Sequence, residues 1–187
     1  MWASADKQQE AQRLRELRIL GVGDLRMTEK MGFETNRFVT FEWRNKFHLY
    51  RQPDGKGIKL RSSEEYKWAR YLDLLLKSGH ITNWEYEPKT FEFEERYRKR
   101  GQYTPDFRVT NANGSTEWYE VKAGFADWQH VVSKFKQFKA DYPSERITLV
   151  VPSCPARSTK RIIKLDKAKK YVDDVIYSGP IFRKLGF

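Results

Sequence analysis

Apolar and polar residues alternate with a period of two in the middle of the chain, which is the pattern of half-buried β-strands. Such runs extend over residues 84–94, 102–110 and 116–123. Residues 146–151 are instead apolar at almost every position, as in a strand covered on both faces, and Pro152 ends the run. We therefore predict four strands, the last of them in the middle of a sheet.

Two other segments repeat their apolar residues with the helical period. The first begins after Ser62 and extends to about Lys77, with Glu65 placed to complete a capping box and Gly79 beyond its end. The residues expected on its inner face are Tyr66, Ala69, Leu72 and Leu76. The second helix covers 125–142. Its apolar face consists of Trp128, Val131, Phe135 and Phe138.

These elements occur in the order helix, three-stranded antiparallel meander, helix, further strand, and they define an α/β core that we place at residues 60–152. The preceding residues, 1–59, form an N-terminal extension. A helix is expected there at 5–20, and two strands are expected within 37–50. The remaining residues, 153–187, form a C-terminal tail.

The turn between the second and third strands decides which side chains face each other. A two-residue Asn113-Gly114 loop would set Asp106 opposite the apolar Val121 and bury a carboxylate. A three-residue loop over 112–114, with its glycine in the left-handed conformation, sets Asp106 opposite Glu120 instead. We predict the three-residue loop.

That register gathers charged groups on one face of the sheet. Alternation puts Glu120 and Lys122 on the same face, and Asp106 joins them from the neighbouring strand. Opposed carboxylates repel each other, so this pairing requires a cation between them or a proton on one of them. Oxygen ligands of this kind suit Mg²⁺ or Mn²⁺. The string 120–122 alone is more often an ion-paired surface strand, and the added aspartate favours the metal site.

These residues resemble the signature of the PD-(D/E)XK nuclease superfamily, in which Pro105-Asp106 is followed after thirteen residues by Glu120-Val121-Lys122. The segment 60–151 is similar in layout to small phage endonucleases of the Holliday-junction-resolvase type and to the nuclease subunit that cuts transposon ends. The resemblance implies a restriction-endonuclease-like core in which Asp106, Glu120 and Lys122 are catalytic. The implied metal ligands are the two carboxylates and the backbone carbonyl of Val121.

The superfamily also carries a glutamate on the helix before its first core strand, and Glu65 stands in the matching place. The resemblance implies that Glu65 is catalytic and completes the metal site. The structural alternative is that Glu65 only caps the helix by bonding back to Ser62.

The composition favours a polyanionic partner. Lys and Arg total 36 against 25 acidic residues, which gives a net charge of +11 and a pI of about 9.7. DNA is the simplest such partner. The C-terminal tail is basic too, with a helix expected from Leu165 to Ile176. The run 95–100 either contacts DNA or is a solvated hairpin tip. Its candidate DNA-binding residues are Arg96, Arg98, Lys99 and Arg100.

Other chemistries lack their residues. Cys154 is the only cysteine, so no intrachain disulfide can form. The three histidines, His48, His80 and His130, have no spacing that would make a zinc site. There is no signal-peptide core and no run of about 18 apolar residues. We expect no membrane association, and a location in the cytoplasm, that of the host cell if the chain is phage-encoded, or at the nucleoid.

The sequence thus predicts a Mg²⁺- or Mn²⁺-dependent DNA endonuclease that acts in recombination, repair or the processing of phage or mobile-element DNA. The alternative is a non-catalytic nucleic-acid-binding or assembly subunit that retains the nuclease fold. Junction cleavage would require a homodimer, whereas cleavage of strand ends would suit one subunit of a larger complex. Residues 1–59 are the candidate surface for either partner, and the sequence leaves both open.

Overall fold

A five-stranded mixed sheet forms the centre of the protein. The computed structural model describes residues 48–94, 101–124, 128–153 and 159–187. β3, β6 and β7 are antiparallel neighbours, whereas β8 and β9 run parallel to β7. The protein is therefore of the α/β class and contains the predicted antiparallel meander. In spatial order the strands are β3 (Ile81–Tyr86), β6 (Phe107–Asn111), β7 (Thr116–Val121), β8 (Ile147–Val151) and β9 (Asp174–Tyr177).

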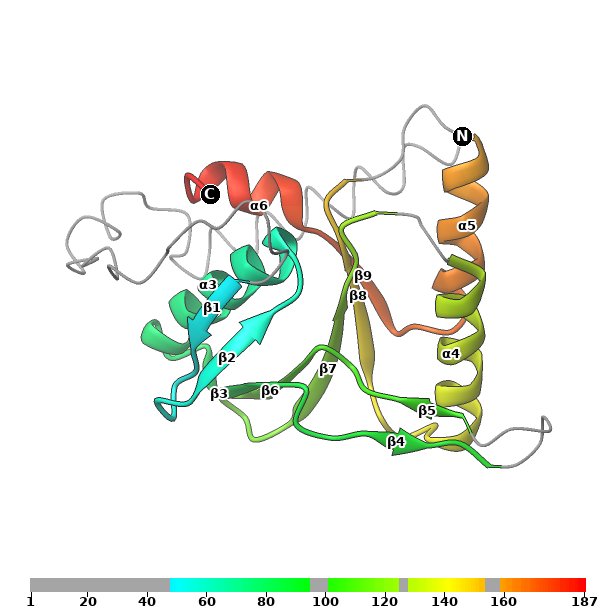
Figure 1. Cartoon of the computed structure of the whole chain (residues 1–187), viewed down its shortest axis with the longest axis horizontal. Coiled ribbons are helices and arrows are strands. Elements are labelled where there is room, and N and C mark those ends of the chain that lie inside the picture. Colours follow the sequence, from blue (N-terminus) through cyan, green and yellow to red (C-terminus); the bar gives the residue numbers. More distant parts are fainter. Residues whose placement is uncertain (1–47, 95–100, 125–127, 154–158) are drawn as a thin grey trace.

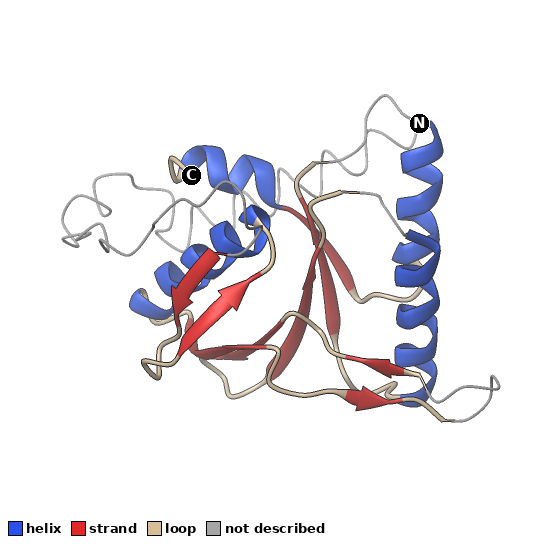
Figure 2. Cartoon of the chain, viewed as in Figure 1, coloured by secondary structure: helices blue, strands red, loops and turns tan. Residues whose placement is uncertain are grey.

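Helices cover both faces of this sheet (Figure 1, Figure 2). On one face lie α3 (Ser63–Lys77) and α6 (Ser178–Lys184), and on the other α4 (Trp128–Asp141) and α5 (Thr159–Lys169) lie side by side. Two short strand pairs complete the fold. They are β1 (His48–Arg51) with β2 (Gly57–Leu60), near α3, and β4 (Phe91–Glu92) with β5 (Gln102–Tyr103), near α4. No helix within the described ranges is long and apolar enough to cross a membrane.

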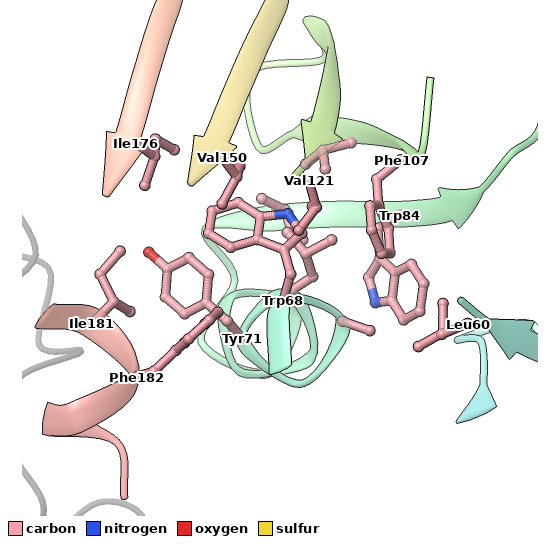
Figure 3. Packing of buried hydrophobic residues seen from close by; sticks show 14 residues of the cluster. Leu60, Trp68, Tyr71, Trp84, Phe107, Val121, Val150, Ile176, Ile181 and Phe182 are labelled. Carbon is pink, nitrogen blue, oxygen red and sulfur yellow. The ribbon is translucent and has the colours of Figure 1, made fainter. Parts of the chain in front are cut away.

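Alternation along the central strands divides the apolar core into two clusters. Between the sheet and α3, Trp68 packs against Val121 and Val150 (Figure 3). On the opposite face, Leu149 belongs to a second cluster that includes Phe138 of α4. Every residue of β8 is buried because the strand has a cluster on each side, as its continuous apolar sequence predicts.

The predicted three-residue connection between β6 and β7 is confirmed. The N–H of Asn111 donates to the carbonyl of Ser115 at 2.8 Å, and Gly114 has a φ of +83°. The ladder between the strands has the predicted register. Asp106 and Glu120 are therefore the next opposed positions at the end of this ladder.

The helix predicted after Ser62 is also confirmed. Ser62 is the N-cap of α3, and its hydroxyl oxygen accepts the backbone N–H of Glu65 at 3.2 Å. The predicted inner face is correct in part. Ala69 and Leu72 are buried as predicted, whereas Tyr66 and Leu76 are only partly buried. The observed inner face is centred instead on Trp68, which was not among the predicted residues. An indole offers more apolar surface than any other side chain, so its burial decides how the helix is rotated.

Two predicted strands are wrong in extent. The runs 84–94 and 102–110 each have the pattern of one strand, but each is divided between the central sheet and the small β4–β5 pair. Pro88 has no N–H for a ladder, and Glu87 before it adopts a left-handed φ of +46°. Pro105 lies in the second break.

The helix predicted from Leu165 to Ile176 is wrong in its second half. α5 begins earlier and ends at Lys169, and the following residues form β9 beside β8. Val175 and Ile176 are β-branched and fit a pleated sheet, and Ile176 is buried in the core. The C-terminal tail thus supplies an edge strand of the central sheet, which its basic composition does not indicate.

Some predictions lie outside the described residues. They are the helix at 5–20, most of the strand pair within 37–50, and the basic run at 95–100 with Arg96, Arg98, Lys99 and Arg100. The described end of that strand pair is β1. Its partner is β2, a strand that the sequence pattern does not predict.

Candidate functional site

Asp106 lies just before β6, and its side chain reaches across to the neighbouring strand. Its Oδ2 accepts the backbone N–H of Val121 at 2.7 Å. Its own carbonyl oxygen accepts the N–H of Glu87 at 2.8 Å. The residue is only 6% exposed. These two hydrogen bonds hold the carboxylate at the end of β7, beside Glu120.

Glu120 is the centre of a buried polar cluster at the same end of β7. The residue is 6% exposed, and both carboxylate oxygens have partners. Lys122 Nζ lies 2.5 Å from Oε1, and the hydroxyl of Tyr103 donates to Oε2 at 2.8 Å. The backbone of Lys122 is fixed to β8, because its N–H donates to the carbonyl oxygen of Val150 at 2.9 Å. The structure therefore places the predicted aspartate, glutamate and lysine together.

Glu65 approaches this cluster from the first turn of α3. Its carboxylate accepts hydrogen bonds from Ser62 Oγ and the Arg61 N–H, both at 2.9 Å, and from the Tyr86 hydroxyl at 2.8 Å. Glu65 is 6% exposed, and its charge contributes to the electrostatic environment of Asp106. The capping role is therefore present, and Glu65 lies near the other carboxylates as well.

The electrostatics separate the roles of the two ionisable groups beside Glu120. Burial raises the pKa of Asp106 well above its ordinary range, and the charges of Glu120 and Glu65 raise it further, against the opposing effects of Lys122 and the Val121 N–H. Burial lowers the pKa of Lys122, but Glu120 and Asp106 outweigh it, so the net shift is upward. Lys122 therefore stays cationic at neutral pH, and without a metal the raised pKa of Asp106 favours its protonated form.

Four residues at the site were not singled out as site residues from the sequence: Tyr86, Tyr103, Arg61 and Glu87. Burial raises the pKa of Glu87, with added contributions from Glu65 and Glu120, while Arg61 lowers it. Glu87 therefore stands within the field of the acidic cluster. The only local sequence feature that sets Glu87 apart is that it precedes Pro88, a residue that cannot continue a central strand.

A cavity of about 240 Å³ lies on the α3 side of the sheet, away from the charged cluster. The described residues that line it are aromatic and aliphatic side chains together with His80 and Asn111, and none of these described residues is a lysine, an arginine or a carboxylate. Trp68 of α3 and Ile176 of β9 are among its walls. The charged side chains described above therefore lie at the end of β7, outside this cavity.

The donor chemistry at the end of β7 fits a hard divalent cation. Within the described ranges, no three His, Cys, Asp or Glu side chains gather closely enough to hold a metal by themselves. Mg²⁺ commonly uses only one or two protein carboxylates and completes its shell with water and substrate oxygens. Asp106 and Glu120 match that requirement, and Val121, with its backbone carbonyl, directly follows Glu120 in the sequence. Glu65 is engaged at the helix cap.

Asp106→Asn is expected to stabilise the metal-free protein. Because the folded protein raises the pKa of Asp106 above the ordinary 3.8, the folded state retains a proton that the unfolded chain releases. Stability therefore falls as the pH rises above about 4, and an amide removes this loss while still accepting the Val121 N–H. We expect a gain of about 1–2 kcal/mol at pH 8, or roughly 2–8 °C in Tm, which shrinks toward pH 4.

Thermal unfolding in EDTA between pH 4 and pH 8 measures this difference. Asp166→Asn is the control, because Asp166 is exposed on α5 and its substitution should shift stability by less than about 0.5 kcal/mol. A Tm of Asp106→Asn equal to or below that of the wild type at pH 8 would contradict the protonation of buried Asp106.

The fold and the cluster define an α/β protein with a buried carboxylate and lysine site at the end of a β-hairpin. Residues 44–158 match the family DUF1064, described as a protein of unknown function, and the chain belongs to this family. The match contains β1 to β8 and all the site residues described above. No curated protein and no solved structure matches the chain.

Proposed function

We propose that this protein is a Mg²⁺- or Mn²⁺-dependent endonuclease that hydrolyses phosphodiester bonds of DNA. The observation that carries the proposal is the pair of buried carboxylates, Asp106 and Glu120, at the adjoining ends of β6 and β7, with the Lys122 ammonium against Glu120. Two buried carboxylates side by side lower the stability of the folded protein unless a cation or a proton compensates their charge. A site of this kind is suited to bind a cation and a phosphate together.

Asp106 and Glu120 would hold the metal ion. When bound, the ion would stabilise the charge that builds on the phosphate oxygens and would make an adjacent water more acidic. The buried position of the two carboxylates excludes competing water, so their interaction with a cation is stronger than it would be at the surface. Asp106 must lose its proton to act as a ligand, so metal binding should be weaker at low pH.

Lys122 would donate to a phosphate oxygen or orient the attacking water. Its ammonium already lies at Glu120 and is cationic, which fits a donor to developing negative charge. Tyr103 would fix the orientation of Glu120 through its hydroxyl. Glu65 would act from the helix cap, through its charge or through a bridging water.

Two further features support a nuclease. The net charge of +11 favours association with a polyanion. The element order around the site, a helix followed by an antiparallel meander, a helix and a parallel strand, agrees with the PD-(D/E)XK resemblance of the sequence. We therefore include a restriction-endonuclease-like core in the proposal. Roles in recombination, repair or mobile-element processing belong to it as well.

The alternative is a non-catalytic subunit that binds nucleic acid. The feature that favours it is that both oxygens of Glu120 are engaged, one by Lys122 and one by Tyr103. A non-catalytic subunit would bind DNA with a steep salt dependence and show no metal-dependent turnover. Cleavage assays with Mg²⁺ and with EDTA separate the two functions.

Tyr103→Phe tests whether Glu120 is held for catalysis. The substitution removes the hydroxyl that bonds Glu120 and keeps the ring, which is buried among aromatic side chains. Partners that orient a metal ligand typically contribute ten- to a hundredfold to metal affinity or activity. We expect a decrease of about tenfold or more in the cleavage rate at limiting Mg²⁺, measured under single-turnover conditions.

Tyr142→Phe is the matched control, because the Tyr142 hydroxyl bonds the carbonyl of Glu92 rather than a site carboxylate. Its cleavage rate should stay within about threefold of the wild type. Equal rates for Tyr103→Phe and Tyr142→Phe would show that the hydroxyl of Tyr103 has no part in the reaction.

A further inference from the structure

Arg61 joins β2 to the N-cap of α3 and is tied to the candidate site through its backbone. Its N–H donates to Glu65 Oε2 at 2.9 Å, so the main chain is fixed against one of the buried carboxylates. The side chain, in contrast, is 62% exposed. Arg61 therefore combines a rigid attachment with a guanidinium that reaches solvent at the rim of the acidic cluster.

The described partner of this guanidinium is Glu87, whose Oε1 lies 2.6 Å from the Arg61 Nη2. Glu87 is fixed in the same manner, because its N–H donates to the carbonyl oxygen of Asp106 at 2.8 Å. Its φ of +46° is a conformation that favours glycine or asparagine, so the glutamate is held there at a conformational cost. Each member of the ion pair is thus bonded by its main chain to a carboxylate residue of the site.

The Arg61 guanidinium can exchange its carboxylate partner for a phosphate. The Arg61 side chain is 62% exposed and that of Glu87 is 23% exposed, so water can solvate the guanidinium when the two separate, and a pair with one exposed partner contributes little to folding stability. Phosphate oxygens match the planar fork of a guanidinium in two parallel hydrogen bonds, as a carboxylate does, and phosphates of DNA offer this repeatedly along the backbone. A phosphate brought to the end of β7 would meet the Arg61 side chain at the rim of the site.

We propose that Arg61 binds a backbone phosphate of DNA beside the candidate site, and that the Glu87 carboxylate competes with that phosphate for the guanidinium in the free protein. The proposal rests on the proposed function and adds a positioning residue to it. Arg61 orients the substrate rather than reacting with it. Glu87 sets the affinity by occupying Arg61 until DNA arrives.

Equilibrium binding of a labelled DNA duplex in EDTA, measured over a range of salt concentrations, tests this without any cleavage. Arg61→Gln should weaken binding about tenfold at 0.1 M salt and reduce the slope of log affinity against log salt by about 1, the amount for one phosphate contact. Arg61→Lys should recover part of the affinity. Glu87→Gln should tighten binding by about threefold or more.

The double variant Arg61→Gln with Glu87→Gln separates competition from a simple change of net charge. If Glu87 acts through Arg61, its removal should give no gain once Arg61 is gone. A gain of the same size in both backgrounds would overturn the competition. It would leave Glu87 as a distant negative charge.

Arg146 and Glu117 provide a closely matched control pair. Arg146 is 63% exposed and Glu117 is 23% exposed, against 62% and 23% for Arg61 and Glu87. Their nearest atoms are 3.6 Å apart, and Glu117 lies near the beginning of β7, away from the site. Arg146→Gln should change the affinity by less than about twofold. Equal effects of Arg146→Gln and Arg61→Gln would overturn the role of Arg61.

The outcomes also distinguish this inference from the proposed function. If the wild type cuts DNA but Arg61→Gln binds as Arg146→Gln does, only the role of Arg61 is wrong. If the wild type neither binds nor cuts DNA, the proposed function is wrong and the inference fails with it. Thermal unfolding of each variant verifies that losses of binding are not losses of folding.

Discussion

Asp106→Asn is expected to abolish DNA cleavage and to leave DNA binding in EDTA unchanged. The side chain is one of two buried carboxylates that would hold the metal ion, and an amide cannot supply the negative charge. Loss of a metal's stabilisation of several kcal/mol corresponds to a rate decrease of about a thousandfold or more. Single-turnover cleavage with Mg²⁺ measures the rate, and fluorescence anisotropy in EDTA measures binding.

The same variant is predicted to be more stable than the wild type without metal. A gain in stability together with a loss of cleavage is the combination expected of a residue kept for chemistry rather than for folding. Asp166→Asn should cleave at the wild-type rate. Cleavage by Asp106→Asn within about tenfold of the wild type would remove Asp106 from the site.

Lys122→Ala and Lys122→Arg should both slow cleavage by about a hundredfold or more. The Lys122 ammonium contacts Glu120 at the end of β7, and in the proposed reaction it would donate to one oxygen of the phosphate or to the water. A planar guanidinium has the same charge but directs its donors differently, so it would misplace the hydrogen bond. The expected loss is the scale found when one preorganised donor to a transition state is removed.

Lys59→Arg is the control for this pair, because Lys59 is exposed on β2. DNA affinity should change little in all three variants, so the loss at Lys122 should appear in the rate and not in binding. If Lys122→Arg retained near-normal cleavage, Lys122 would be part of the general basic surface and not of the catalytic machinery.

The elements that local sequence determines were predicted correctly. Ser62 and Glu65 form a cap within one turn of helix, and Gly114 permits the left-handed residue that the three-residue loop needs. The register of β6 and β7 follows from that loop. Because the register was predictable, the proximity of Asp106 and Glu120 was predictable too, although the hairpin separates them in sequence.

The parts that were mispredicted depend on contacts distant in sequence. β9 is a strand because β8 offers it a parallel partner, and nothing in its own short sequence excludes a helix. Tyr103 reaches Glu120 only because the strand containing it turns away from β6 at Pro105. The alternation of apolar and polar residues continues through this segment, so Pro105 is the only feature of the sequence that indicates the break.

Arg61 and Glu87 show the same limit at the site. Arg61 has the sequence context of an ordinary residue before a helix cap, and Glu87 that of a polar strand residue. Their ion pair arises because β2 and β3 lead into the same corner of the fold, and Glu87 adopts a backbone conformation unusual for glutamate. The positions of Arg61 and Glu87 at the site can therefore be recognised only from the tertiary structure.

DNA cleavage by the purified wild-type protein, measured with Mg²⁺ or Mn²⁺ and then with EDTA, tests most directly whether the protein is a metal-dependent nuclease. Linear, supercoiled, flapped and four-way-junction DNA should be tested alongside Lys122→Ala protein prepared in the same way. We expect that at least one form of DNA is cut, that EDTA prevents the cut, and that the Lys122→Ala protein does not cut it. The absence of cleavage of every form, or equal cleavage by Lys122→Ala, would contradict the assignment of a metal-dependent nuclease site to Asp106, Glu120 and Lys122.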